Sequence, residues 1–462
     1  MTERTGPLRV AVIGAGPSAF YAVQALLDSE DPAVEIDMFD RLPTPFGLVR
    51  YGVAPDHLRV KSVTRVFAAI ARHPRVRFFG GVEYGTHIAL EDLKRHYHQI
   101  LFATGATSHW TLGVPGEDLK NVHAARDFVA WYNGHPDFRS RSFALTQPRV
   151  AVIGMGNVAL DVARMLCLTP AELAATDMPE HARSALATSG VEEVFVLGRR
   201  GPAQAAFTPP ELRELAKLDG ADLILRPEEI ELDDVSRAAL DAGDDRAAKR
   251  NVALLEGLAE AAPAGKARRL HLRFLASVGA FSANEHDAVR SLSLSRNRIA
   301  AKATGTVFAE ATGEIEDLPA GLVFRAVGYR GEPLPGLPFD ERWGVLPNDR
   351  GRVLDPSDGH RCEGIYAAGW IKRGPSGVIG TNKPDARETA GSMLEDARSG
   401  LALDPSAPDS EEVAATLRSQ RPRYFTFDDW LVIDELERAR GEAAGRPRLK
   451  FTSVEEMDAA RR

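Results

Sequence analysis

The stretch Leu8-Arg-Val-Ala-Val-Ile-Gly-Ala-Gly-Pro-Ser-Ala19 joins an apolar run to the pattern G-x-G-x-x-A. The run 8–13, apolar except for Arg9, predicts a buried strand, and the residues from Ser18 to about Leu27 predict a helix. Between them, Gly14 permits a tight turn and Gly16 lets the backbone approach a pyrophosphate. The N-terminus of the helix would offer free N–H groups to the phosphates. This stretch therefore predicts the opening of a doubly wound α/β domain that binds a dinucleotide.

The next expected strand, 35–39, ends at an acidic residue. Asp40 follows Gly16 by 24 residues, and an acid at this spacing can accept hydrogen bonds from the hydroxyls of a ribose. A glycine loop alone is a weak motif, so the position of this acid supplies needed context. The alternative for Asp40 is an ordinary turn residue at a strand end. We expect ribose binding, and with it a nucleotide such as FAD.

A second glycine loop, Gly154-Met-Gly-Asn-Val-Ala159, lies between an expected strand at 150–153 and an expected helix at 158–168. The strand after that helix, 194–197, ends in Gly198-Arg-Arg-Gly201 and carries no acid. An acid would repel a 2′-phosphate, whereas a pair of arginines favours it, and each charge-assisted hydrogen bond contributes about 1.5–3 kcal/mol. The alternative is a solvated arginine pair on a loop. Two loops with different sugar readouts predict FAD at the first and NADP(H) at the second.

Composition limits the class of protein. The 462 residues are 44% hydrophobic and 26% charged, which is ordinary for a folded protein with several cores. The formal net charge of −8 argues against a nucleic-acid partner. The two cysteines, Cys167 and Cys362, form no Cys-x-x-Cys motif, so we expect a reducing, cytoplasmic location, with neither a dithiol, a metal site nor an iron–sulfur cluster in the chain itself. No run of 18 apolar residues is present, so we expect no membrane span.

The rest of the chain reads as further α/β structure. Three apolar segments end in small residues and glycine, and a strand that ends in glycine lets the backbone pass close to a cofactor, although each alone could be a tight turn. These segments are 100–105, 323–328 and 364–369. Further strands are expected at 271–275, 289–294 and 322–327, exposed helix and loop between about 228 and 269, and helix with an extended tail over the last fifty residues.

Three longer motifs carry a resemblance. They are Pro45-Phe-Gly-Leu-Val-Arg-Tyr-Gly-Val-Ala-Pro-Asp-His57, Gly154-Met-Gly-Asn-Val-Ala-Leu-Asp-Val-Ala-Arg164 and Ala368-Gly-Trp-Ile-Lys-Arg-Gly-Pro-Ser-Gly-Val-Ile-Gly-Thr-Asn382. With them the chain resembles the adrenodoxin reductase type of ferredoxin–NADP⁺ reductase, a branch of the glutathione-reductase-like flavoproteins, from the first strand to about residue 382. The resemblance implies two Rossmann-like, three-layer α/β domains. The FAD domain would comprise 1–107 and 331–462, with the NADP domain, 108–330, inserted into it.

The resemblance also implies roles for single residues. FAD would be held by Gly14, Gly16, Ser18, Asp40, Leu48, Val82, Trp370, Gly377, Val378 and Ile379. NADP(H) would be held by Met155, Gly156, Asn157, Val158, Arg199, Arg200, Glu211 and Gly377. The candidate catalytic group, which would position rings or relay a proton near flavin and nicotinamide, is His57, Asp161 and Glu214.

These assignments have plainer alternatives and two departures from the family pattern. Asp161, Glu211 and Glu214 lie early in expected helices, where acids often serve only as partners of the helix dipole. His57 could be a packed loop residue and Trp370 simple core. Position 40 is Asp where relatives often have Glu, and the residue after His57 is Leu where Pro is common.

The implied reaction is hydride transfer from NADPH to FAD, followed by one-electron transfers to a ferredoxin-type iron–sulfur protein. Ferredoxins are usually acidic, so we expect transient electrostatic docking near the flavin edge. Candidate docking cations are Arg50, Arg59, Lys61, Lys372 and Arg373. The alternatives are an NADPH-dependent flavoenzyme with a quinone or other small-molecule acceptor, the flavin subunit of a larger reductase, and a redox-sensing protein that binds both cofactors without useful turnover.

Overall fold

The fold was analysed in a computed structural model that describes residues 6–302, 304, 306–420 and 423–462. The chain divides into two compact units. The first comprises Met1–Val53, His57–Trp110 and Gly328–Arg462, and the second comprises Ala54–Asp56 and Thr111–Val327. The domain limits expected from the sequence, 107/108 and 330/331, each lie three residues from these boundaries, and the sequence gives no sign of the three-residue segment that joins the second unit.

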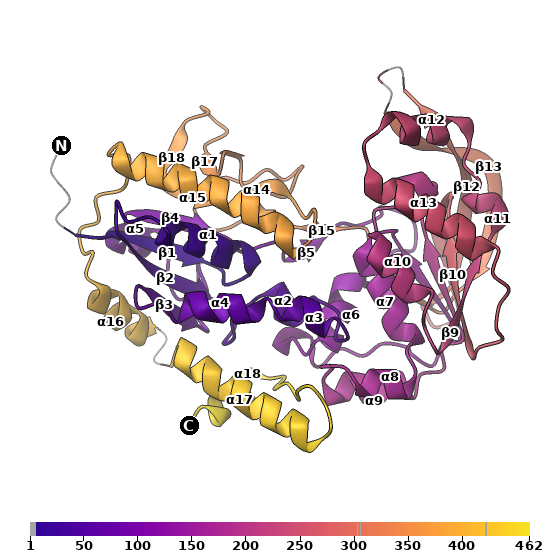
Figure 1. The fold of residues 1–462 in the computed structure, drawn as a ribbon, viewed down its shortest axis with the longest axis horizontal. Helices are drawn as coiled ribbons and strands as arrows, with labels where there is room; N and C mark the ends of the chain where they lie inside the picture. Colours follow the sequence, from indigo (N-terminus) through magenta and orange to yellow (C-terminus); the bar gives the residue numbers. More distant parts are fainter. Residues whose placement is uncertain (1–5, 303, 305, 421–422) are drawn as a thin grey trace. The chain divides into compact units, whose positions relative to one another are not determined.

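The described part of the first unit is built on a seven-stranded sheet with the order β16-β17-β18-β4-β1-β2-β3 (Figure 1). The five strands from β18 to β3 are parallel, and β16 and β17 are added antiparallel at one edge. The strands are β1 (Leu8–Ile13), β2 (Val34–Asp40), β3 (Val76–Gly80), β4 (Gln99–Phe102), β16 (Asn348–Asp349), β17 (Arg352–Leu354) and β18 (Arg361–Ala367). A separate two-stranded antiparallel sheet is formed by β5 (Ser108–His109) and β15 (Tyr329–Arg330).

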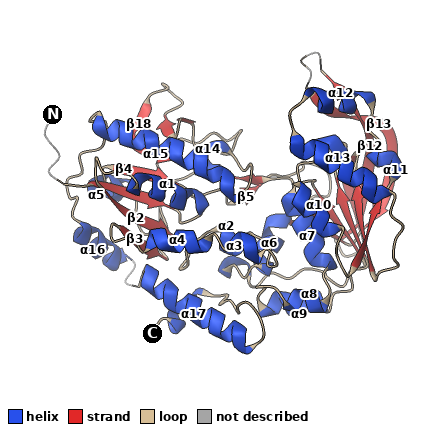
Figure 2. Ribbon diagram, in the orientation of Figure 1, coloured by secondary structure: helices blue, strands red, loops and turns tan. Residues whose placement is uncertain are grey.

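Both faces of this sheet are covered, which explains why β1 is apolar apart from Arg9, whose buried side chain pairs with Asp37. Val10 and Val12 pack into a core shared with α1, α4, α15 and α17, while Ala11 and Ile13 pack into the opposite core with α5 and α16 (Figure 2). The helices of this unit are α1 (Pro17–Leu27), α2 (Leu48–Tyr51), α3 (Leu58–Lys61), α4 (Thr64–Ala71), α5 (Leu90–His96), α14 (Trp370–Arg373), η3 (Ile379–Thr381), α15 (Asn382–Arg398), α16 (Ser410–Gln420), α17 (Phe427–Ala443) and α18 (Val454–Ala460).

The second unit repeats this plan with a six-stranded, all-parallel sheet of order β6-β14-β7-β8-β10-β9. Its strands are β6 (Val122–Ala124), β7 (Arg149–Ile153), β8 (Glu193–Leu197), β9 (Ala221–Leu225), β10 (Arg268–Arg273) and β14 (Leu322–Arg325). Its helices are α6 (Ala125–Tyr132), η1 (Pro136–Phe138), α7 (Asn157–Cys167), α8 (Pro170–Ala174), α9 (Glu180–Ala187), η2 (Pro202–Gln204), α10 (Pro209–Leu215), α11 (Pro227–Ile230), α12 (Asp234–Ala242) and α13 (Arg246–Ala259).

A three-stranded antiparallel sheet forms the third layer of the second unit. It consists of β11 (Ala276–Ala283), β12 (Val289–Ala301) and β13 (Val307–Pro319). Val150 and Val152 of β7 face the helices, whereas Ala151 and Ile153 face this small sheet. The expected class, two three-layer α/β domains, is therefore confirmed. The strands β11 and β13 were not predicted, because β11 is rich in small residues and β13 is mostly exposed.

The C-terminal part of the chain is tied to the N-terminal part by a buried ion pair. Arg50, on α2, forms two hydrogen bonds with the carboxylate of Glu437 on α17, at 2.9 and 2.5 Å, and both side chains are buried. Arg448 and the main-chain N–H of Phe451 also donate to Glu437, at 2.8 and 2.9 Å. The segment after α17, which was expected to be an extended tail, therefore folds back onto that helix and ends in α18.

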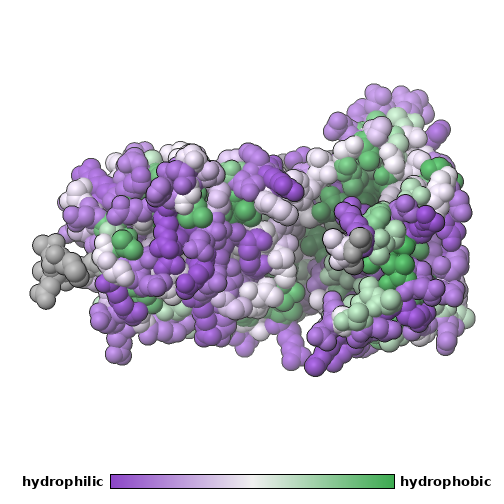
Figure 3. Space-filling view, turned by 90° about the horizontal axis from the view of Figure 1, so that it is seen from above, coloured by the Kyte–Doolittle hydropathy of each residue, from purple (hydrophilic) through white to green (hydrophobic). Residues whose placement is uncertain are grey.

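No helix among the described residues is long and apolar enough to cross a membrane. The face drawn in Figure 3 is largely hydrophilic, with apolar side chains in scattered patches.

Removing the carboxylate of Glu437 should destabilise the protein. In Glu437→Ala the buried Arg50 keeps its charge and loses its partner, a change that costs about 3–5 kcal/mol. Chemical unfolding followed by circular dichroism measures the loss. Glu435→Ala, on the exposed side of the same helix, is the matched control and should change the midpoint little. Equal effects of the two substitutions would contradict this role of the pair.

The same pair should make stability depend on acidity. Burial alone would raise the pKa of Glu437, but the charge and hydrogen bonds of Arg50 outweigh it and hold this pKa below its usual value. The stabilisation is therefore complete above the unfolded pKa of about 4.3 and is lost as pH falls through the lower folded pKa. The difference in unfolding free energy between the wild type and Glu437→Ala should narrow on acidification over that range.

Candidate functional site

The two glycines of the first loop have different tasks. Gly14 has φ +103°, and a Cβ placed there would lie 2.5 Å from the main-chain oxygen of Ala103, which follows β4. Gly16 caps α1 with an ordinary extended backbone, and a Cβ placed there would meet no heavy atom within 4 Å. Gly14 is therefore required by packing, whereas Gly16 leaves open space in front of the helix N-terminus.

Asp40 closes the same loop from the end of β2. One carboxylate oxygen accepts the N–H of Ala15 at 2.9 Å, and the other accepts the N–H of Leu42 at 2.9 Å. Burial raises the pKa of Asp40, although these two backbone hydrogen bonds act in the opposite direction. The bond to Leu42 is the turn interaction that was the alternative for this residue. Each oxygen still has a free lone pair, so the turn role leaves room for a ribose hydroxyl.

A second segment, residues 46–48, crosses the first glycine loop. Phe46, at φ +84°, donates its N–H to the main-chain oxygen of Ala15 at 2.8 Å. A Cβ on Gly47 would lie 3.0 Å from the Cα of Gly16. The next residue, Leu48, is 38% exposed although it is apolar. The motif Pro45-Phe-Gly-Leu48 is the sequence signal for this crossing. Of these four residues, only Leu48 was predicted to hold FAD.

The remaining FAD candidates lie in the segments that follow β3 and β18. A Cβ on Gly369, just after β18, would lie 2.3 Å from the Oγ of the buried Ser18 on α1. Trp370 follows, half-buried, with its ring 5.5 Å from that of Tyr329. Val82, after β3, is buried and donates its N–H to the main-chain oxygen of Asp40 at 2.9 Å.

The segment from Gly377 to Ile379 leads into α15. Gly377 has φ +77°, and a Cβ placed there would lie 2.3 Å from the Oγ1 of Thr381. Val378 is 52% exposed, and Ile379 packs against the core that contains α1. Exposed apolar side chains at positions 48 and 378 suit an apolar ring system such as a flavin.

The second glycine loop repeats the division of tasks seen in the first. Gly154 has φ +137°, and its Cβ would lie 2.3 Å from the main-chain oxygen of Ala326, which follows β14. Gly156 caps α7, and its Cβ would meet nothing within 4 Å. The side chain of Asn157 already has a partner within the protein, because its Oδ1 accepts the N–H of Thr208 at 2.8 Å. Met155 and Val158 pack partly against the core of the second unit.

Arg199 and Arg200 follow β8 and are both exposed. Among the residues that the structure describes, neither guanidinium group forms an ion pair or a side-chain hydrogen bond. The pKa of Arg200 is lowered, first by partial burial and then by the positive charge of Arg199. Two adjacent cations without a counter-charge form a ready site for an anionic group.

Two of the three acidic candidates of the second unit lie around one buried cation. Arg164, on α7, is 3% exposed and forms salt bridges with Asp56, Asp161 and Glu214, the last at 3.3 Å. Glu211 lies in the first turn of α10, where it also suits the helix dipole. Asp161 and Glu214 are therefore brought together, which the sequence could not show, and Arg164 is the residue that does so.

His57 belongs to the first unit, where it immediately precedes α3 and is half-buried. Its main-chain oxygen accepts the N–H of Lys61 at 3.1 Å, so the helix begins at Leu58, where proline is common in the family. Of the candidate catalytic group, His57 is thus in one unit, and Asp161 and Glu214 are in the other.

Three of the five expected docking cations are buried, and that part of the prediction is wrong. Arg50 is buried in a salt bridge with Glu437, and Lys61 is only 9% exposed. Lys372 is 8% exposed and paired with Asp385 at 3.1 Å. Arg373 hydrogen-bonds to Ser376 and Asn382, so only Arg59 remains as a freely exposed cation of that set.

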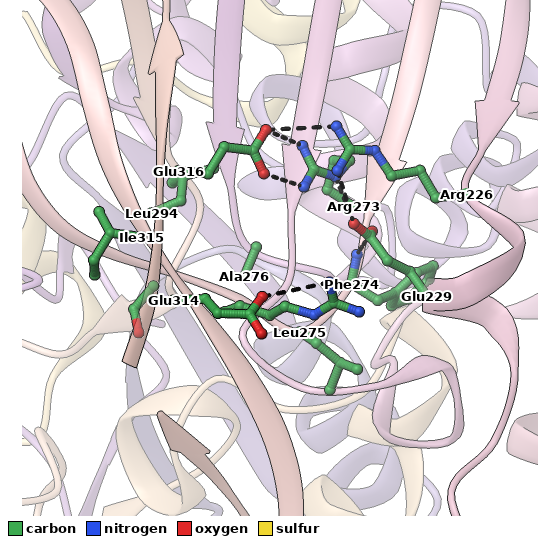
Figure 4. A pocket seen from close by; sticks show the side chains of 12 residues that line it. Arg226, Glu229, Arg273, Phe274, Leu275, Ala276, Leu294, Glu314, Ile315 and Glu316 are labelled. Carbon is green, nitrogen blue, oxygen red and sulfur yellow. Dashed lines mark hydrogen bonds and ion pairs between the residues drawn. The ribbon is translucent and has the colours of Figure 1, made fainter. Parts of the chain in front are cut away.

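A pocket in the second unit lies at none of the candidate residues. Arginine and glutamate side chains from α11, β10, β12 and β13 line it (Figure 4). Glu316 faces Arg226 and Arg273, at 3.4 and 2.7 Å, and Arg273 also pairs with Glu229 at 2.8 Å. The ion pair of Arg273 with Glu316 links β10 to β13. Since the charges that line the pocket are already paired, the pocket offers little to a charged ligand.

The residues present fit the two expected cofactors. Gly16 and Gly156 leave open space at helix N-termini, where pyrophosphate groups bind. The acid at the first sugar position and the uncompensated arginine pair at the second differ as FAD and NADP(H) require.

Comparison with known proteins agrees with this geometry. A family model described as FAD-NAD(P)-binding matches residues 11–149. The chain is 45% identical to the NADPH-ferredoxin reductase FprA of Mycobacterium tuberculosis over 98% of each chain, and 39% identical to the mitochondrial NADPH:adrenodoxin oxidoreductase of Arabidopsis thaliana over 98% of this chain and 95% of that one. The structure of Mycobacterium tuberculosis FprA in complex with NADPH superposes with a TM-score of 0.92 at 44% identity, covering 99% of this chain and 100% of that one.

Alanine substitutions in the second glycine loop should separate packing from ligand binding. Gly156→Ala should fold normally, because its backbone is ordinary and its Cβ meets open space. The added methyl group would occupy the approach to the pyrophosphate and raise the KM for NADPH by about tenfold or more.

Gly154→Ala is the contrasting variant and should lower the thermal midpoint, since its Cβ would overlap a main-chain oxygen. Circular dichroism and steady-state kinetics measure both effects. Unchanged NADPH binding in Gly156→Ala would exclude this loop as the pyrophosphate site.

Proposed function

The chain belongs to the family of NADPH-ferredoxin reductases, and we propose that it is an FAD-dependent enzyme that carries electrons from NADPH to a ferredoxin-type iron–sulfur protein. One observation supports this most strongly: two glycine loops with the same backbone plan lead to opposite sugar readouts, Asp40 in one and Arg199 with Arg200 in the other. Such a pair suits two different nucleotides in one chain.

The first unit would bind FAD and the second NADP(H). The open space at Gly16 and the carboxylate of Asp40 would take the pyrophosphate and ribose of FAD, with Leu48 and Val378 against its rings. When bound, FAD accepts a hydride from NADPH and releases electrons singly. The tasks left to the chain are to hold both nucleotides, orient their rings and exclude water.

The NADP(H) site would use the second glycine loop. The open space at Gly156 would receive the pyrophosphate, and the guanidinium groups of Arg199 and Arg200 would grip the 2′-phosphate. Asp161 and Glu214 are engaged by Arg164, so we assign them to positioning and not to proton donation. His57 would likewise orient the rings. A reducing, cytoplasmic location remains part of the proposal, since Cys167 and Cys362 are free thiols.

The docking surface for the iron–sulfur protein would be the exposed side of α3 and α4. No Asp or Glu occurs from His57 to Val82, although the chain carries a net charge of −8. Arg59, Arg65 and Arg72 are exposed there, and within the described part of the chain none of them forms an ion pair. This basic α3–α4 surface also exposes three apolar side chains, which suits a partner that is acidic at its rim. They are Leu58 at 39%, Val60 at 46% and Val66 at 55%.

Anaerobic stopped flow tests the proposed reaction. The flavin absorbance of the holoenzyme should bleach rapidly with NADPH and much more slowly with NADH. Subsequent addition of an oxidised ferredoxin should restore the flavin absorbance and reduce the ferredoxin. Bleaching by NADPH without transfer to any ferredoxin, but with rapid transfer to a quinone, would replace the proposed acceptor by a small molecule and leave the cofactors in place.

Charge reversal tests the docking surface. The double substitution Arg59→Glu and Arg65→Glu should lower kcat/KM for an acidic ferredoxin at low salt by about tenfold or more, because electrostatic steering is lost. The loss should shrink as salt is added, and turnover with a neutral quinone should stay unchanged. Arg418→Glu, an exposed position on α16, is the control. Equal losses per reversed charge at both places would refute a localised docking surface.

A further inference from the structure

The loop that carries the arginine pair is fixed through three consecutive main-chain oxygens. The oxygen of Gly198 accepts the N–H of Ala276 at 2.9 Å, and that of Arg200 accepts the N–H of Leu275 at 3.1 Å. The oxygen of Arg199, between them, is held by a side chain: Nδ2 of Asn297 donates to it at 2.8 Å. Asn297 is thus the one side chain in this set of three anchors.

Asn297 is itself rigidly placed. It lies on β12 and is 5% exposed. Its main-chain N–H donates to the oxygen of Leu275 at 2.7 Å, and its Nδ2 also donates to the Oγ of Ser277 at 2.7 Å. The pairing of β12 with β13 is irregular just before it, between Ser295 and Asn297. A bulge at this point re-aims side chains, and here it accompanies an amide that reaches the arginine loop.

The chemistry of the anchor requires an amide. The main-chain oxygen of Arg199 can only accept, so the group facing it must be the NH₂ of Asn297 and not its oxygen. Both hydrogens of that NH₂ are used, one for Arg199 and one for Ser277. Alanine offers no donor at all, and the hydroxyl of serine is too short to replace the amide.

The anchor matters because the two side chains it supports repel each other. Arg199 and Arg200 are adjacent cations that form no ion pair among the described residues. A bound 2′-phosphate would relieve this repulsion only if both guanidinium groups reach it together. A main chain that is free to turn at Arg199 would let the two groups separate, and the phosphate would then meet one of them.

We propose that Asn297 is a positioning residue that sets the preference for NADPH over NADH. By holding the main chain of Arg199, it keeps the guanidinium groups of Arg199 and Arg200 on one 2′-phosphate. This inference rests on the proposed function, which places the 2′-phosphate at the arginine pair.

The test compares four variants of the holoenzyme with the wild type: Asn297→Ala, Asn121→Ala, Arg199→Ala and Arg200→Ala. Asn121 is the matched control, since its amide also donates to a main-chain oxygen, that of Gly321 at 3.2 Å, at another place in the second unit. KM and kcat are measured for NADPH and for NADH, and the affinity for 2′-AMP is measured by calorimetry. Circular dichroism and flavin content report the fold.

In Asn297→Ala the KM for NADPH should rise by about tenfold, which corresponds to loss of one hydrogen bond at the charged site. The affinity for 2′-AMP should fall by the same factor, while kcat and the KM for NADH stay as in the wild type. Asn121→Ala should change none of these. A merely structural role for Asn297 would instead affect both nicotinamide nucleotides equally.

The outcomes separate the two proposals. If the arginine variants lower the preference for NADPH but Asn297→Ala does not, the role of Asn297 is refuted and the 2′-phosphate site stands. If the arginine variants also leave the preference intact, the proposed 2′-phosphate site itself fails. Should Asn297→Ala fold poorly, Asn297→Ser gives the same comparison, because its hydroxyl cannot reach the oxygen of Arg199.

Discussion

Both units depend on a close approach between two pieces of backbone that only glycine permits. At Gly14 and at Gly154 a Cβ would lie 2.5 and 2.3 Å from a main-chain oxygen, that of Ala103 and that of Ala326. Each oxygen belongs to the segment that leaves the neighbouring parallel strand, β4 or β14. The contact therefore sets how closely the two strand ends meet, at the carboxyl edge of the sheet where ligands of this fold bind. The second glycine of each loop is left free for the ligand.

The local sequence pattern predicted those helices, strands and loops whose burial follows from the α/β fold alone. The first strand, Leu8–Ile13, was predicted to the residue, because a strand buried on both faces is apolar along almost its whole length, with Arg9 as the exception here. The two glycine loops and the acid at Asp40 followed from spacing. The strand β13 could not be predicted from the sequence, since its outer side is exposed and its sequence is rich in acids.

Residues with distant partners were the harder part of the site. Arg50 and Lys372 read as surface cations, yet the first is buried against Glu437 and the second against Asp385. Arg164 lies in the second glycine-loop motif without a predicted role of its own, although it forms salt bridges with Asp56, Asp161 and Glu214. Asn297 stands outside every motif. In each case the role is defined by a partner from another element, and no local period or spacing records it.

The buried pair of Arg50 and Glu437 has a consequence for synthesis. Its members are separated by 387 positions, and β18, which completes the parallel part of the first sheet, begins only at Arg361. On the ribosome the second unit, nearly continuous from Thr111 to Val327, can therefore close first. During this time the sheet of β1 to β4 has an unpaired edge at β4, and Arg50 has not yet met its partner Glu437. The nascent N-terminal segment therefore exposes an unpaired strand edge until the C-terminal residues are made, and exposed edges favour aggregation.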